Sequence, residues 1–400
     1  MTKKFLFILL TVLPFLSFAL DKDTIEVFEK NESQIELIGE IIATLESNHL
    51  VKVDYSTIKS DAFAEYLERL DPNKTIFTLP EIDIFFERVS LALNVEEDLD
   101  IAFDIFNKYS ERYLLRYETQ TDFLNYLNED NLNSSRTLIR DLSESTRLNN
   151  LKDLENLWVD LSTNDVIQLM LSGNSQDIAV EKTRKRMNNQ LNFFKQTRSE
   201  DVFNIFVNSV GSMYGPHTTY MSPKNSEDFD ITMSLSLEGI GALLSSDGLY
   251  TSISSLVPGG PAEKTDLIKP KDKIVGVGQE DEEGIVDVVG WRIDDVVDLI
   301  RGPKGSKVRL EIIPSSSLND SETKQIEIIR NVVKLEDQAA EKEILNIQRG
   351  DVNYKVGIIE LPAFYMDFDA FQRRDLSYKS ASKDVKKLLK ELKQENVDGL

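Results

Sequence analysis

Two glycines one residue apart, Gly239 and Gly241, stand in the segment LEGIGA at 237–242. Glycine adopts positive φ angles without steric cost, so successive amides of such a segment can point into one concavity and bind an anion. The terminal carboxylate of a peptide fits a nest of this size, and a strand that starts at Ile240 would offer its edge to the same peptide. The spacing also occurs at ordinary tight turns, so the pattern alone leaves both interpretations open.

A nest that binds a main-chain carboxylate does not choose between sequences, so selectivity needs an apolar pocket beside it. Ile240 and Ala242 could share such a pocket with side chains at helical spacing further along the chain. The predicted peptide-binding residues are Gly239, Ile240, Gly241, Ala242, Val296, Val297 and Ile300.

Several other kinds of active site are excluded by residue usage. The chain has no Cys and only 2 His, which excludes disulfides, thiolate ligands, cysteine nucleophiles and a multi-histidine metal centre. We therefore expect no metal site and no cofactor. His217 stands beside turn residues without a visible catalytic partner, and we expect it to make a structural hydrogen bond to the loop backbone.

Ser380 and Lys383 have the Ser-x-x-Lys spacing of penicillin-recognising enzymes. The companion sequences Ser-Asp-Asn and Lys-Thr-Gly are absent from the chain. We interpret Ser382 as the cap of the following helix and Lys383 as a solvated side chain. We assign no catalytic residue within these 400 residues.

Length and composition indicate a folded, acidic protein of two or three domains, at roughly 150 residues per domain. Hydrophobic residues make up 41% and charged residues 29%, which argues against wholesale disorder and against a multi-span membrane protein. The net charge of −23 repels nucleic-acid phosphates and anionic lipids, so we expect neither as a partner.

The first residues have the features of an export signal. Lys3 and Lys4 precede an apolar stretch from Phe5 to Phe18, and small residues at Ser17 and Ala19 predict cleavage after Ala19. A membrane anchor is the alternative, but the stretch falls short of the roughly 20 residues that a spanning helix needs. We expect an exported protein without a stable membrane span.

Hydrophobic periodicity predicts the elements that would position the candidate site. Apolar residues repeat at helical spacing from about 21 to 222, as in Ala62, Phe63, Tyr66, Leu67 and Leu70. The loop at 214–223 contains breakers and marks a domain boundary. The run of basic residues between 182 and 186 is interpreted as a solvated helix face.

From 233 to about 330 the period is two, which predicts strands, for example through Val308, Leu310 and Ile312. Two helices interrupt them, one that opens at Pro261 and one at about 294–300. After 335 we expect polar helix or loop, then a strand at 356–361 and an amphipathic helix. This order of strand and helix predicts an unfinished α/β unit.

These motifs resemble the tail-specific proteases, also called carboxy-terminal processing serine proteases. The motifs similar to the PDZ domain of that family are EGIG at 238–241, GGPA at 259–262, KIVGVG at 273–278, GWR at 290–292 and RGPKGS at 301–306. Those similar to its helical domain are LDPN at 70–73 with Phe77, and PHT at 216–218 with Tyr220, Ser222 and Pro223. Gly215 departs from the pattern, where the family has an acidic residue.

The resemblance implies an α+β multidomain protein. Its expected parts are a signal peptide at 1–19, an all-helical amino-terminal domain at 20–225, a PDZ domain at 232–335 and the beginning of an α/β protease domain at 336–400. The PDZ domain is expected as a small β-sandwich or barrel with two helices.

The resemblance also implies a periplasmic endopeptidase that recognises apolar carboxy-terminal tails of protein substrates through its PDZ domain. An adaptor protein is a further partner to expect. Cleavage would use a Ser-Lys dyad that lies beyond residue 400, without metal or cofactor, so these residues alone should bind and not cut. The alternative is a short secreted PDZ protein that binds peptides without catalysis. The gene sequence beyond Leu400 would distinguish the two.

Overall fold

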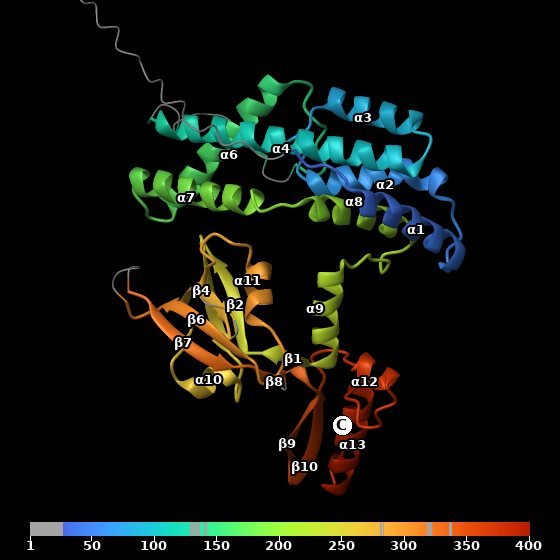
Figure 1. The fold of residues 1–400 in the computed structure, drawn as a ribbon, viewed down its shortest axis with the longest axis vertical. Coiled ribbons are helices and arrows are strands. Elements are labelled where there is room, and N and C mark those ends of the chain that lie inside the picture. Colours follow the sequence, from blue (N-terminus) through green and yellow to red (C-terminus); the bar gives the residue numbers. More distant parts are fainter. Residues whose placement is uncertain are drawn as a thin grey trace, which may run out of the picture. The chain divides into compact units, whose positions relative to one another are not determined.

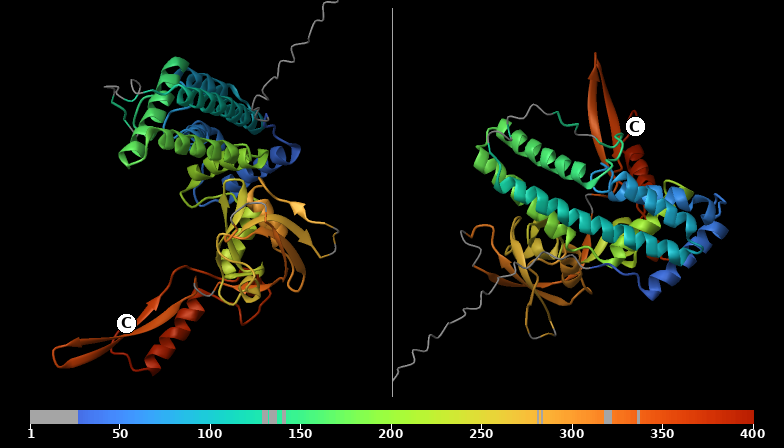
Figure 2. Two further views of the ribbon diagram at one scale, coloured as in Figure 1. Left: turned by 90° about the vertical axis from the view of Figure 1, so that its left-hand side faces the viewer. Right: turned by 90° about the horizontal axis from the view of Figure 1, so that it is seen from above.

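The computed structural model describes residues 27–128, 132, 137–139, 142–280, 282, 284–317, 322–335 and 338–400. The expected export signal at 1–19 lies outside the described residues. The chain divides into two compact units, Met1–Thr219 and Tyr220–Leu400 (Figures 1 and 2). Among the described helices, none combines the length and the apolar character needed to span a bilayer.

The first unit is helical, which confirms the expected all-helical domain (Figure 1). Its helices are α1 (Glu32–Asn48), α2 (Tyr55–Leu70), α3 (Leu79–Leu91), α4 (Val95–Asn125), α6 (Leu151–Leu171), α7 (Gln176–Phe194) and α8 (Ser199–Tyr214). All five of the apolar residues predicted to share one face of α2 are buried. That face packs against α8, where the rings of Phe63 and Phe206 lie 5.0 Å apart.

The second unit combines helices with antiparallel sheets, as the α+β prediction requires. Its elements are α9 (Pro223–Ser234), β1 (Ser236–Gly239), β2 (Ala242–Asp247), β3 (Tyr250–Leu256), α10 (Pro261–Thr265), β4 (Lys273–Gln279), β5 (Val286–Asp287), α11 (Ile293–Ile300), β6 (Lys307–Ile313), β7 (Lys324–Ile329), β8 (Asn331–Lys334), β9 (Glu341–Arg349), β10 (Val352–Glu360), α12 (Phe368–Gln372) and α13 (Ala381–Gln394).

The main sheet has the strand order β2-β3-β4-β6-β7, with β5 paired to β4, so β2 and β7 are its edges. The predicted alternation is confirmed in β6, where Val308, Leu310 and Ile312 are each 0% exposed. These side chains join a core that also contains Ile326 and Ile328 of β7. β1 and β8 form a separate two-stranded antiparallel ribbon. In the chain, β1 directly precedes β2, and β8 directly follows β7.

The expectation of polar helix or loop after residue 335 is wrong for the segment that forms β9. This strand pairs along its whole length with β10, from Glu341 opposite Glu360 to Arg349 opposite Val352. Gly350, with φ of +59°, turns the chain between them. Several side chains of both strands are exposed, so hairpin pairing and not burial determines the structure of this polar sequence.

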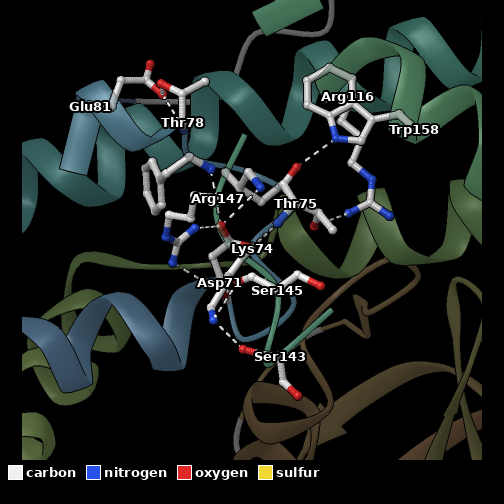
Figure 3. A network of polar contacts seen from close by, with 12 residues as sticks. Asp71, Lys74, Thr75, Thr78, Glu81, Arg116, Ser143, Ser145, Arg147 and Trp158 are labelled. Carbon is white, nitrogen blue, oxygen red and sulfur yellow. Dashed lines mark hydrogen bonds and ion pairs between the residues drawn. The ribbon is translucent and has the colours of Figure 1, made fainter. Parts of the chain in front are cut away.

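The turn after α2 is organised around one buried carboxylate (Figure 3). Asp71 is 2% exposed, and its side chain accepts hydrogen bonds from the amides of Thr75 (2.7 Å), Ile76 (3.1 Å) and Phe77 (3.2 Å). The same carboxylate forms an ion pair with Arg147 from a distant loop. A buried carboxylate is tolerated only when it is paired and hydrogen-bonded, and here both conditions hold.

Further contacts tie this turn to the rest of the helical unit. Trp158 of α6 is fully buried, and its indole nitrogen donates to the Thr75 carbonyl at 2.7 Å. Lys74 donates to the Ser145 carbonyl at 2.9 Å, and Arg116 of α4 donates to the Thr75 hydroxyl at 3.1 Å. The motif that resembled the family's helical domain therefore has a structural role: it joins α2, α4 and α6.

Replacing Asp71 with Ala should destabilise the helical unit by about 3–5 kcal/mol, because the variant leaves three amides and the Arg147 guanidinium without their buried partner. The chain has 2 Trp, so a Trp291→Phe background makes Trp158 the sole fluorescent reporter of this unit during urea unfolding. Replacing the exposed Asp83 with Ala is the control, with an expected change within about 0.5 kcal/mol. Equal effects of the two substitutions would contradict the assigned role.

Candidate peptide-binding site

The backbone at Ile240 and Gly241 is held through its carbonyl groups. The Ile240 carbonyl accepts a hydrogen bond from the Ala262 amide at 2.8 Å, and the Gly241 carbonyl accepts one from the Val257 amide at 2.9 Å. Gly241 has φ of +73°, which is the left-handed region. Within the part of the chain that the structure describes, the amides of Ile240 and Gly241 donate no hydrogen bond. Two successive donors are therefore available to an anion.

The first residue of β2 supplies a third donor. β2 is an edge strand, and Ala242 stands opposite Leu256 of β3. The Val257 amide donates to the Gly241 carbonyl, so Ala242 and Leu256 form a non-hydrogen-bonded pair of the antiparallel ladder. In such a pair the amide of each residue points away from the partner strand, so the Ala242 amide points away from β3. The open edge of β2 thus continues directly from the nest, although the strand begins at Ala242 and not at Ile240 as expected.

Glycine is required at 241 for steric as well as conformational reasons. A Cβ atom built there would lie 3.2 Å from Gly260 Cα and 3.3 Å from a methyl group of Val333. Val333 belongs to β8, and Gly260 precedes α10. The nest is therefore enclosed from behind by two separate elements, and a side chain at 241 would displace them.

The second wall of the site is α11, which lies beside β2 (Figure 1). Val296 and Ile300 of this helix join Ile240 in the core, where each is at most 3% exposed. We use the word groove for the strip of surface between β2 and α11, where a bound side chain would pack over these core residues. Ala242 of β2 and Val297 of α11 are half-buried residues of the two elements that border this strip.

Two residues that border the groove, Leu244 and Ile293, were not among the peptide-binding residues predicted from the sequence. Leu244 of β2 is half-buried and packs against the same core cluster, and Ile293 at the start of α11 is half-buried. Leu244 follows Ala242 by two residues, so it lies on the same face of the strand. Ile293 precedes Val297 by four residues, so both lie on one face of the helix. The two periodicities would have identified them.

A buried arginine fixes the end of α11. Arg330 is 3% exposed, and its guanidinium donates to the carbonyls of Leu299 (3.0 Å) and Ile300 (2.7 Å), the last two residues of the helix. It also donates to the Gln279 side chain at 2.7 Å. Burial lowers the pKa of Arg330, but an arginine remains protonated at neutral pH. Its positive charge is attracted to the partial negative charge at the carboxyl end of α11 and stabilises it. Sequence reasoning did not single out this residue.

Glycine at 302 allows this arrangement. A Cβ atom built on Gly302 would lie 3.0 Å from Arg330 Cζ, so only glycine lets the backbone pass the guanidinium this closely. On the next residues of the same loop, the Lys304 amide donates to the Glu238 carboxylate at 3.0 Å. Arg301 pairs with Asp228 of α9 at 2.6 Å. The loop after α11 is thereby bonded to the strand that leads into the nest.

The Ser-x-x-Lys pair does not form an active site. Ser380, and not Ser382 as expected, is the N-cap of α13 and accepts the Lys383 amide at 3.4 Å. The interpretation of Lys383 as a solvated side chain is also wrong, because its amine donates to the carbonyls of Leu376 (2.9 Å) and Tyr378 (3.2 Å). Because these two carbonyls hold its amine, Lys383 is not positioned as a general base for Ser380.

The structural hydrogen bond expected of His217 is made by the other histidine. His217 is exposed and forms no hydrogen bond with the described residues. His49 Nε2 lies 3.0 Å from the Thr218 hydroxyl, and its Nδ1 accepts the Val51 amide at 3.0 Å. Across the described ranges, no group of three acidic or histidine side chains is arranged to hold a metal ion.

Replacing Gly241 with Val should weaken the binding of a short peptide with a free carboxyl terminus by more than about tenfold, because the side chain strains the left-handed backbone and displaces the elements behind the nest. Gly248 is the matched control: its φ is +65°, but a Cβ there meets nothing within 4 Å. Gly248→Val should bind within about twofold of the unmodified chain.

Limited proteolysis should show that the PDZ region of both glycine variants remains folded. If Gly241→Val unfolds it, Gly241→Ala adds the Cβ alone and serves as the milder variant. Unchanged peptide affinity in a folded Gly241 variant would place the binding site elsewhere.

The sequence matches two known domain families. Residues 41–224 match the family described as the tail specific protease N-terminal domain, and residues 229–313 match the PDZ domain family. The chain is 34% identical over 364 residues to the tail-specific protease of Haemophilus influenzae, which covers 88% of this chain and 49% of that relative. It thus spans about half the length of that protein.

Two further similarities concern shorter segments. The carboxy-terminal processing protease CtpA of Bacillus subtilis is 40% identical over 103 residues, which covers 26% of this chain and 21% of that relative. A crystal structure of the PDZ domain of a carboxy-terminal protease from Vibrio cholerae in complex with peptide shares 52% identity. It covers 25% of this chain and 99% of that chain, with a TM-score of 0.24. With its helical domain followed by a PDZ domain, this chain belongs to the tail-specific protease family.

Proposed function

We propose that this chain binds the apolar carboxy-terminal tails of protein substrates for a serine endopeptidase of the periplasm. The observation that carries the proposal is the set of three amides, at Ile240, Gly241 and Ala242, that face away from the protein's own hydrogen-bond acceptors. A carboxylate accepts several amide hydrogen bonds at once, and bonds to a charged acceptor are the stronger kind.

The tail would add to the main sheet as a new strand along β2. Antiparallel pairing places its last residue at Ala242 and directs the preceding residues toward Asp247. Side chains of a strand alternate, so the last residue and the third from last face α11, whereas the residue between them faces solvent. The last residue would pack on Ile240 and Ile300, and the third from last between Leu244 and Val297.

Cleavage itself is proposed for the whole protein and not for these residues. The family resemblance favours a serine nucleophile and a neutral lysine that takes its proton, with backbone amides to stabilise the oxyanion, and without metal or cofactor. Both catalytic residues would lie beyond residue 400. The tail held at β2 would then keep the substrate close to that centre and raise its local concentration. An adaptor protein is a further proposed partner.

Amidating the carboxyl terminus of a tail peptide should weaken its binding by about 1–3 kcal/mol, because the amide group cannot supply the charge-assisted acceptor that the nest requires. Fluorescence anisotropy with the 400-residue chain and paired acid and amide peptides measures this difference. Equal affinities would refute carboxylate recognition. A protein substrate that carries the same tail should remain intact during the incubation, and cleavage would place the catalytic residues within this chain.

The expected export signal supports the proposed periplasmic location. Expressed with its first residues intact in a Gram-negative host, the chain should be recovered from the periplasm with Leu20 as its first residue. Replacing Leu9 and Leu10 with Arg interrupts the apolar stretch and should leave the protein unprocessed in the cytoplasm. Amino-terminal sequencing and fractionation measure both outcomes. An unprocessed protein anchored in the inner membrane would contradict export as a cleaved protein.

A further inference from the structure

An exposed apolar surface lies at the end of the groove opposite the nest. Leu249, Val289 and Trp291 are 51%, 37% and 44% exposed, and we call these three residues the shelf. The Gly290 amide donates to the Leu249 carbonyl at 2.7 Å, which joins the β2–β3 turn to the loop before α11. The shelf residues are thus neighbours in space although they come from two segments.

Both walls of the groove lead to the shelf. β2 runs from Ala242 to Asp247, Gly248 turns the chain, and Leu249 follows. On the other side, Trp291 precedes the first residue of α11 by two positions. A tail that leaves the groove therefore passes between the two segments that carry the shelf.

The length of β2 determines which part of a tail reaches this place. A tail with its last residue at Ala242 places each earlier residue opposite the next residue of β2, so the fifth before the last stands opposite Asp247. The register of β2 with β3 shifts between Leu243 and Leu244, but the extra residue, Ser254, lies in β3, so the spacing along the free edge of β2 is unbroken. The sixth residue before the last follows this strand and, by the same alternation, faces α11 as the last residue does, so it is the residue that can reach the shelf.

We propose that the shelf is an upstream subsite that favours tails with an aromatic or large aliphatic residue six positions before the last residue. This inference rests on the proposed function, because it requires the tail to run along β2. The indole of Trp291 offers a flat apolar face with few internal degrees of freedom, which suits stacking with an aromatic side chain. Apolar surface that continues a groove in this way indicates an extended binding site.

The test uses three acetylated peptides with free carboxyl termini and the 400-residue chain. The short peptide has four residues, with Leu and Val at the third-from-last and last positions and Ser elsewhere. Two longer peptides extend it to seven residues with Ser, and one of them has Phe at the sixth position before the last, which is its first residue. We expect the peptide with Phe to bind about fivefold more tightly than its Ser counterpart.

Trp291→Ala should abolish the advantage of the Phe peptide and leave the affinity for the short peptide unchanged. Ile329 of β7, on the opposite edge of the sheet, is 56% exposed, so Ile329→Ala is the matched control and should keep the advantage. Because both side chains are exposed, neither substitution should disturb folding.

The possible results separate the two proposals. If the short peptide binds but Phe adds nothing, or if Trp291→Ala keeps the advantage, the subsite is refuted and tail recognition stands. Equal weakening of all three peptides by Trp291→Ala also refutes a subsite for upstream residues. If the short acid peptide does not bind at all, both proposals fail.

Discussion

The left-handed backbone of Gly241 is the constraint on which the binding site depends. Gly241 has φ of +73° between β1 and β2, and here the carbonyls of Ile240 and Gly241 accept hydrogen bonds while their amides donate none to the described residues. Ala262 and Val257 occupy those carbonyls at 2.8 and 2.9 Å. These intramolecular hydrogen bonds to the carbonyls fix the orientation of the amides of Ile240 and Gly241 but leave the amides themselves available. A carboxylate would meet a site that needs little reorganisation, which reduces the free-energy cost of binding.

Hydrogen bonds within the protein also hold the elements around the nest in place. Arg330 holds the carbonyl end of α11, and Gly302 allows the loop after that helix to pass close to it. The strand that leads into the nest pairs with β8, which begins directly after Arg330. One short segment thus supports both walls of the groove. Loss of any of these contacts should affect the width of the groove before it affects the fold of the helical unit, which has its own buried centre at Asp71.

Periodicity in the sequence was enough to predict the elements with a buried face, but it predicted neither the exposed strand β9 nor the partners of each element. The alternation of buried residues in β6 and the apolar face of α2 both follow from the local spacing of apolar residues, so both could be predicted from the sequence alone. The availability of the Ile240 amide depends on acceptors elsewhere in the domain, and the Arg330 contacts join residues about 30 positions apart. The hydrogen bond between His49 and Thr218 spans 169 positions, and His217, the more conspicuous residue in the sequence, lies exposed beside it. Such pairings arise only when the chain has folded.

The most direct test is to observe the donor groups themselves during a titration. In the 400-residue chain labelled with ¹⁵N at glycine, alanine and isoleucine, the amide protons of Ile240, Gly241 and Ala242 can be followed by nuclear magnetic resonance. We expect a tail peptide with a free carboxylate to shift all three amide proton resonances strongly downfield, and its amidated counterpart to shift them weakly. Amide protons at these positions that are already protected from exchange in the free protein, and that do not move when the acid peptide binds, would contradict this expectation.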